Sequence, residues 1–254
     1  MQSGIWRRVI FFLLLLGAWE TVCRLGVWEA TLFPSPLQVL QSLWRTIEDR
    51  SLLLATGVSL RRILIGYGLS LVLGVTLGVL LARFRWLDET VGSLVMGLQT
   101  LPSICWLPLA LLWFGLNDRA ILFVIVMGSL LAVTVAVQDG VRNLPPVYFR
   151  AAQTMGTRPL ALYTQVLIPA SLPAILTGAK LGWSFAWRSL MAGELLFVSM
   201  GLGHLLMMGR ELADMSQVMA VMLVIVALGL LTDRAIFGAL EQRVREQWGL
   251  SHSG

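Results

Sequence analysis

Three ionisable side chains, Lys180, Arg188 and Glu194, stand in an otherwise apolar run late in the chain. An ionisable group at membrane depth costs about 3 kcal/mol on insertion scales, so such groups face a cavity or an ionic partner. Lys180 and Glu194 would lie roughly 21 Å apart along a helix, too far to pair with each other. Arg188, near the middle, could lower the energy of an anion that crosses the membrane, alone or together with Lys180. The alternatives are that Lys180 reaches the membrane surface and that Glu194 pairs with a neighbouring helix.

Two prolines interrupt an uncharged segment that could form a transport path. Residues 90–117 contain no charged side chain, and Pro102 and Pro108 lie within this segment, in TLPSICWLPLALLWFG. Each proline frees a backbone carbonyl that lipid cannot satisfy, so we expect the segment to face protein or water, although a plain kink is equally compatible. The predicted translocation path comprises Pro102, Pro108, Trp183, Trp187, Arg188 and Glu194.

Other chemistry is excluded by what the sequence lacks. It holds no GxxxxGK[ST] phosphate loop, and Lys180 is its only lysine, so we do not expect this chain to hydrolyse ATP by that route. Cys23 and Cys105 have no metal-binding spacing, and the two histidines are isolated, so we predict no metal site and no cofactor bound by this chain. A membrane-embedded enzyme would need a cluster of His, Asp or Ser, and none is present.

The composition is that of an integral membrane protein. Of 254 residues 57% are hydrophobic and 13% are charged, whereas a soluble domain carries about 25% charged residues. The net charge of +5 comes from arginines at the ends of apolar runs, which indicates membrane orientation rather than nucleic-acid binding. We therefore predict an all-α protein with about six spans, a multi-pass topology and both termini in the cytoplasm.

The apolar runs divide one predicted membrane domain, residues 1–254, into segments. Arg61 and Arg62 are placed in a long external loop before the second span. The predicted segments are a first span in 1–30, an external amphipathic helix in 33–53 with Ser35 as its cap and Pro36 at its first position, spans two to four in 60–140, a cytoplasmic loop in 141–172, spans five and six in 173–234, the sixth ending at Thr232, and a cytoplasmic tail in 235–254.

Small residues recur every four positions along the second span. Gly66, Ser70, Gly74 and Gly78 share one face of the predicted helix. A face with almost no side chains lets another backbone approach closely in lipid. We therefore predict that these four residues form a helix-packing surface.

The polar loop at 141–172 reads as two short helices joined at Gly156. Thr157 suits the cap of the second helix, and Ile168 and Pro169 turn the chain back toward the membrane. The loop carries Arg150 and Arg158. Such a rigid basic element is suited to gripping a soluble partner.

The loop and its flanks resemble the permease subunits of bacterial ABC importers. The family signature has two alanines, three residues, a glycine, about ten residues and then Ile or Leu before Pro, which stand here as Ala151-Ala152, Gly156 and Ile168-Pro169. FPSP, LPLALLWFG, QVLIPASLPAILTGAKLGWSFAW and GELLF are similar to the nitrate, sulfonate, taurine and bicarbonate branch of this inner-membrane component family. Arg150 stands where the family usually has Glu, so we expect it to meet an acidic residue of the partner.

The resemblance implies a function, a fold and partners. It implies a type I ABC importer permease fold in the bacterial inner membrane, passing a small anion handed over by an external substrate-binding protein. It also implies a homodimer with a second permease copy and two cytoplasmic ATPase subunits, which bind ATP and Mg. The implied coupling loop comprises Arg150, Ala151, Ala152, Gly156, Thr157, Arg158, Ile168 and Pro169. A vitamin or pyrimidine precursor as substrate, or a secondary transporter or channel, is the alternative function.

Overall fold

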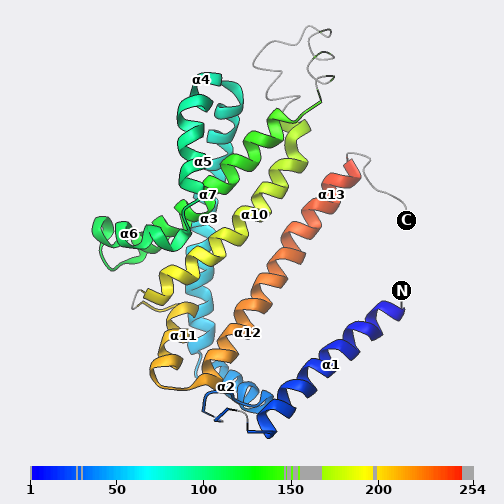
Figure 1. The fold of residues 1–254 in the computed structure, drawn as a ribbon, viewed down its shortest axis with the longest axis vertical. Coiled ribbons are helices and arrows are strands. Elements are labelled where there is room, and N and C mark those ends of the chain that lie inside the picture. The colour runs from blue at the N-terminus through cyan, green and yellow to red at the C-terminus, as the bar shows by residue number, and fades with distance from the viewer. Residues whose placement is uncertain are drawn as a thin grey trace. The chain divides into compact units, whose positions relative to one another are not determined.

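The computed structural model describes residues 2–26, 28–29, 31–145, 147, 150, 154, 168–196 and 199–247, and no strand occurs among them (Figure 1). The helices in chain order are α1 (Gln2–Arg24), α2 (Pro36–Glu48), α3 (Ser51–Arg83), α4 (Arg85–Leu87), the π-helical turn η1 (Asp88–Gly92), α5 (Ser93–Gln99), the 3₁₀ turn η2 (Ser103–Trp106), α6 (Leu107–Phe114), α7 (Asp118–Arg142), α10 (Ile168–Leu196), α11 (Leu202–Glu211), α12 (Met215–Thr232), the π-helical turn η4 (Asp233–Gly238) and α13 (Ala239–Gln247).

Three helical segments in the described part of the chain are long and apolar enough to cross a membrane. They are Ser51–Arg83, Asp118–Arg142 and Met215–Val244, and the bent pair Arg85–Gln99 and Ser103–Phe114 makes a fourth if it is one span. α1 and α10, with 23 and 29 residues, reach the length of a span. α10 also carries Lys180, Arg188 and Glu194, and the prediction of about six spans stays a prediction.

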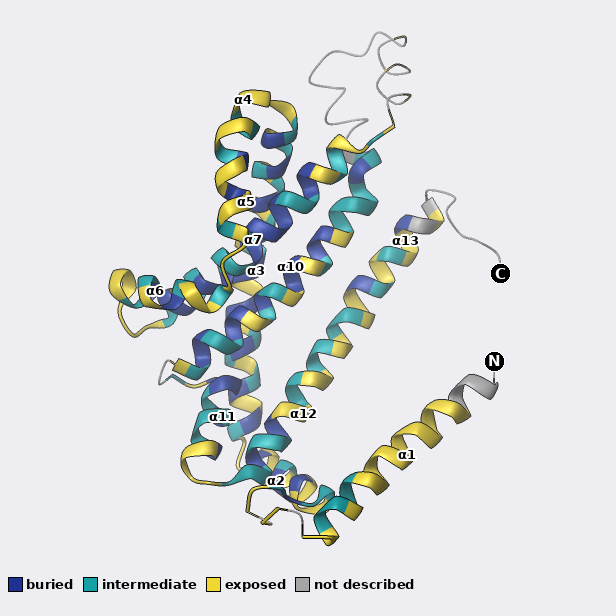
Figure 2. Cartoon of the chain, in the orientation of Figure 1, coloured by how far each residue is buried: buried dark blue, intermediate teal, exposed yellow. Residues whose placement is uncertain are grey.

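The chain groups into two compact units, residues 1–59 with 200–227 and residues 60–199 with 228–254. In the first unit, α2 begins as predicted: Ser35 accepts from the backbone of Gln38 while the Gln38 side chain accepts from Ser35 N–H. Leu37, Leu40 and Trp44 of α2 are exposed (Figure 2), as expected of an amphipathic helix at a membrane interface. The prediction of a single membrane domain stays a prediction.

The second unit is built on α7 and α10, which pack along their lengths (Figure 1). Its core joins Ile63 of α3, Ile125 of α7 and Leu190 of α10, all completely buried. Buried residues recur along α7 and α10 in Figure 2. Tyr67 adds a hydrogen bond, since its hydroxyl donates to the carbonyl of Ala179 at 2.7 Å. α10 is therefore held on two sides by α3 and α7.

The small-residue face of α3 lies against α7. Cβ atoms built on Gly66 and Gly74 would lie 2.7 and 2.9 Å from side chains of Ile125 and Val133. Ser70 accepts a 2.7 Å hydrogen bond from Ser129 of α7. The two helix backbones therefore approach too closely for larger residues along this face.

Gly78→Ala is expected to lower the free energy of unfolding by about 1–3 kcal/mol, because overpacking displaces neighbouring atoms. The added Cβ would lie 2.6 Å from the carbonyl oxygen of Thr134, a backbone atom that cannot turn away. Gly68→Ala on the same helix is the control, since its Cβ would meet no described atom within 4 Å. Denaturation of both variants in detergent measures the difference, and equal stabilities would contradict this packing.

Several predicted element boundaries are wrong. Arg61 and Arg62 lie inside α3, not in a loop, and the chain remains helical there because their charges are paired. Pro108 does not interrupt a helix, because it lies in the first turn of α6, where proline removes no helical hydrogen bond. By contrast, α12 has the bounds predicted for the sixth span, Met215–Thr232, and η4 and α13 follow it; Asp233 and Glu241 of these two elements contact Lys180.

Candidate functional site

A sharp break divides the helical segment between α5 and α6. α5 ends at Gln99, Pro102 precedes η2, and the two halves are bent by 105°. The Thr100 hydroxyl donates a 2.7 Å hydrogen bond to the carbonyl oxygen of Gly97, so one of the free carbonyls at the end of α5 has a partner. The helix is therefore broken at this point rather than gently kinked.

A cavity of about 390 Å³ opens beside this break. Its walls come from residues 99–103, from Met127, Gly128, Leu131 and Ala132 of α7, and from Phe185 and Arg188 of α10. Gln99, Thr100 and Ser103 contribute neutral polar side chains and Arg188 a cation, and no Asp or Glu stands among the described residues that line the cavity. An arrangement of one cation with neutral donors is suited to holding an anion.

Arg188 forms no ion pair within the part of the chain that the structure describes. Its Cζ lies 5.6 Å from the ring centroid of Phe185, a cation–π contact. A guanidinium keeps its charge at any physiological pH and presents five donors in a plane. Because Arg188 has no ion-pair partner among the described residues, its positive charge is available to a mobile anion.

The other ionisable groups of α10 are paired. Lys180 Nζ lies 3.2 Å from Asp233 Oδ1 and 3.5 Å from Glu241 Oε1, on η4 and α13. Glu194 is completely buried, and its Oε1 accepts from Arg62 Nη1 at 2.9 Å. The pairing of Glu194 with a neighbouring helix, considered from the sequence, is therefore present.

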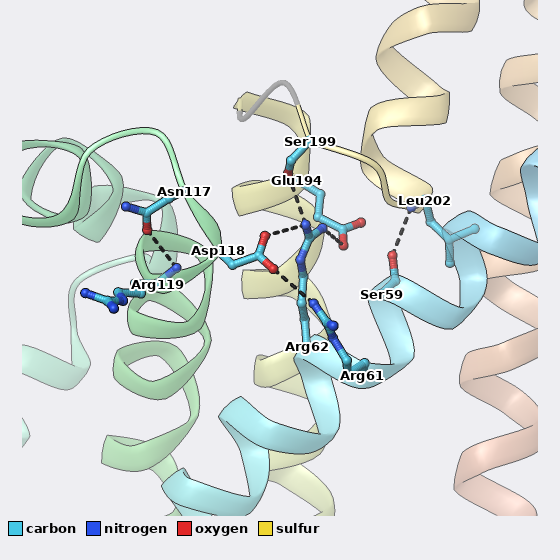
Figure 3. Close-up of polar contacts among 9 residues, drawn as sticks. All are labelled: Ser59, Arg61, Arg62, Asn117, Asp118, Arg119, Glu194, Ser199 and Leu202. Atoms are coloured by element: carbon cyan, nitrogen blue, oxygen red, sulfur yellow. Dashed lines mark hydrogen bonds and ion pairs between the residues drawn. The ribbon is translucent and has the colours of Figure 1, made fainter.

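Arg62, itself buried, joins three helices in one polar network (Figure 3). Beyond Glu194 it donates to Oδ1 of Asp118, the first residue of α7, at 2.6 Å and to Ser199 Oγ at 3.2 Å. Arg61 reaches Oδ2 of the same Asp118 carboxylate at 3.1 Å from an exposed position. The network fixes the start of α7 and the end of α10 to the middle of α3.

The predicted path residues do not all lie together. Pro102 and Arg188 line the cavity, whereas Pro108 and Glu194 do not. Trp183 is buried in the core against Tyr67, with ring centroids 5.2 Å apart, and it stacks on Trp187 at 6.2 Å. The two tryptophans therefore belong to the packing of α10 and do not line the cavity.

Sequence reasoning missed Arg62, Asp118, Gln99 and Ser103. The available signal for Arg62 was the pair of charges, Arg61 and Arg62, within a largely apolar helix of 33 residues. Nothing in the sequence connects it with Glu194, which is 132 residues away.

Most of the predicted coupling loop lies outside the described residues, including Ala151, Ala152, Gly156, Thr157 and Arg158. Arg150 is described and exposed. At the end of the loop, Ile168 and Pro169 form the first turn of α10.

The base of the loop is anchored. Arg142, the last residue of α7, pairs with Oδ2 of Asp88 at 2.7 Å, and Gln138 donates to the other oxygen of that carboxylate. The end of α7 is thereby held against η1.

Residues 74–246 match the family described as binding-protein-dependent transport system inner membrane component. The match covers more than half of the chain. The chain belongs to this family. The resemblance seen in the sequence is thus confirmed, and the protein is an inner-membrane, multi-pass permease subunit of the ABC importer class.

Related permeases match over most of their length. A protein of Methanocaldococcus jannaschii that carries the name of an ABC transporter permease is 34% identical over 73% of this chain and 70% of its own. The nitrate import permease of Leptolyngbya laminosa is 28% identical over 92% of this chain and 86% of its own. A Bacillus subtilis protein that carries the name of an aliphatic sulfonates transport permease is 27% identical over 94% and 86%.

Solved structures confirm the fold of the permease. A chain of the MetNI methionine ABC transporter in inward-facing conformations matches with a TM-score of 0.66 and 19% identity, over 73% of this chain and 92% of that chain. A chain of an amino acid ABC transporter matches with a TM-score of 0.60 and 17% identity, over 79% and 97%. The predicted all-α, type I importer fold is therefore correct.

Proposed function

We propose that this permease passes a small anion across the inner membrane through a path at the helical break. The observation that carries the proposal is Arg188, a cation without a carboxylate partner among the described residues, at a cavity lined by neutral donors. The names of the nitrate and sulfonates relatives support an anion of this kind. Nitrate, sulfonates, taurine and bicarbonate are candidate substrates.

The energy for transport comes from separate subunits in this proposal. The sequence holds no phosphate loop, so ATP and Mg bind to two cytoplasmic ATPase subunits and the permease itself needs no cofactor. The family description names a binding protein, which here delivers the anion from outside. Two permease copies form the membrane path, and both termini of each copy lie in the cytoplasm.

The loop at 141–172 transmits the movement of the ATPase to the path. Its first end contains Arg142, which is tied to Asp88 by the 2.7 Å ion pair, and its second end contains Ile168 and Pro169 in the first turn of α10. α10 also carries Arg188. A displacement of the loop therefore acts on the helix that holds the anion-binding charge.

Ala152→Arg is expected to abolish vanadate-sensitive ATPase activity of the co-expressed complex and to release the ATPase subunit during purification. A charge placed in a packed interface without a partner costs several kcal/mol, and 2 kcal/mol is about a 30-fold loss of affinity. Co-purification and hydrolysis rate measure both effects.

Gln242→Arg serves as the matched control, because it adds the same charge at an exposed position of α13. We expect this variant to retain the ATPase subunit and its activity. Full activity of the Ala152→Arg complex would contradict the assignment of the loop, without affecting the assignment of Arg188.

A further inference from the structure

Ser189, the residue after Arg188 on α10, has a buried hydroxyl with no partner. Its side chain is completely buried, and its Oγ forms no hydrogen bond with any described residue. Buried hydroxyls in proteins are almost always paired, because leaving one unpaired is unfavourable. This hydroxyl therefore needs an explanation that the packing of α10 does not provide.

The hydroxyl lies directly behind the wall of the cavity. A Cβ built on Gly128 would overlap with Ser189 Oγ and would lie 3.1 Å from Cβ of Ser103. Gly128 and Ser103 both line the cavity. The absence of a side chain at Gly128 thus makes room for Ser189 Oγ against α7, next to a residue that lines the cavity.

We infer that Ser189, with Ser103 and Arg188, forms a binding subsite for a monovalent oxyanion with a small apolar substituent. This inference rests on the proposed function and adds the chemistry that the permease itself selects. In the present structure Ser189 does not line the cavity, whereas Gly128, against which its Oγ lies, does. The third donor becomes accessible when the break at residues 99–103 moves away from α7.

The charge of the subsite sets the valence of the anion. Among the described residues that line the cavity, Arg188 is the single cation, and a second negative charge on the ligand would be desolvated without compensation. The oxygens of a monovalent oxyanion can accept from the guanidinium and from the hydroxyls. Leu101, Met127, Leu131 and Phe185 leave an apolar part of the cavity for a short organic group.

The unpaired hydroxyl of Ser189 also bears on the conformation of the helical break. An anion can favour one conformation only by binding it more tightly than the other. The unpaired hydroxyl disfavours the closed arrangement, and an oxyanion that reaches it favours the open one. Ser189 therefore links anion binding to opening of the break.

The test is binding of trifluoromethanesulfonate to the purified full-length permease in nanodiscs, followed by ¹⁹F NMR line broadening. We expect the wild type to bind this probe, Ser189→Ala to raise its Kd about tenfold, and Arg188→Gln to abolish binding. Ser184→Ala is the matched control, because Ser184 is an exposed serine of α10 whose hydroxyl donates to the carbonyl of Lys180; its Kd should equal that of the wild type.

A second readout separates binding from packing. Ser189→Ala removes an unpaired buried hydroxyl, so its melting temperature should equal or exceed that of the wild type although its Kd is raised. Unchanged Kd in Ser189→Ala would overturn the role of Ser189, and so would the absence of probe binding by the wild type. The proposed function would stand in either case if ATP-driven anion uptake by the assembled transporter is intact.

Competition tests the selectivity of the subsite. Methanesulfonate should displace the ¹⁹F probe, whereas sulfate at the same concentration should displace it at least tenfold less effectively. Equal displacement by sulfate and methanesulfonate would overturn the restriction to monovalent anions.

Discussion

Arg62→Met is expected to lower the free energy of unfolding of the permease by about 3–5 kcal/mol, because it removes one partner of a buried ion pair. Glu194 is completely buried, and Arg62 Nη1 lies 2.9 Å from its Oε1. The Arg62 side chain is only 4% exposed. Removal of Arg62 leaves this carboxylate without its cationic partner. Thermal or chemical denaturation of the detergent-solubilised chain measures the loss.

Two further variants make the Arg62 result specific. Arg61→Met changes the neighbouring residue, whose side chain is 64% exposed, so we expect a loss of at most about 1 kcal/mol. The double variant Arg62→Met with Glu194→Leu removes both charges and should recover much of the lost stability. Similar losses for Arg61→Met and Arg62→Met would show that the network contributes nothing particular to the fold.

Arg188→Gln is expected to reduce ATP-driven uptake of nitrate or methanesulfonate by about 100- to 1000-fold. Two unit charges 4 Å apart interact by about 4 kcal/mol at an effective dielectric constant of 20, and each 1.4 kcal/mol of barrier changes a rate tenfold. Glutamine retains hydrogen-bond donors and removes only the charge. Uptake into proteoliposomes that contain the assembled transporter is the measurement.

Arg188→Lys provides the comparison, since it keeps the charge and loses the planar donor arrangement. We expect its uptake to fall within about tenfold of the wild type, given that one good hydrogen bond to a charged group is worth about that much. Assembly with the ATPase should be unchanged in both variants. Unimpaired uptake by a correctly assembled Arg188→Gln transporter would refute the role of this residue.

Local features of the fold follow directly from the sequence. Ser35, Pro36 and Gln38 form the start of α2 because capping depends only on residues a few positions apart. The four-residue spacing of the small side chains places them on one face of α3 for the same reason. The broken helix at Pro102 also follows locally, because proline lacks the backbone N–H that would continue a helix.

Long-range partners could not be derived in the same way. Periodicity identifies the small-residue face of α3, but nothing in the sequence identifies α7 as the helix that packs on it. Arg61 and Arg62 suggested the end of an apolar span, because charges are unfavourable in lipid unless they are paired. Their partner Asp118 is more than 50 residues away.

The candidate site shows the same division. The charge of Arg188 in an apolar run was sufficient to propose an anion, since unneutralised charges in a membrane helix are rare. Ser189 carried no signal, because serines are common in membrane helices and only the position of Gly128 shows that this hydroxyl is enclosed. The sequence therefore reveals the charge, while the neutral donors emerge from the packing of three segments.

The most direct test of this account is anion uptake by proteoliposomes that contain the permease, the ATPase subunit and the external binding protein. The account predicts uptake of nitrate or methanesulfonate that requires ATP on the ATPase side, stops with vanadate and needs the binding protein. Uptake by the permease alone, driven by an ion gradient and unaffected by ATP or vanadate, would contradict it and indicate a secondary transporter or channel.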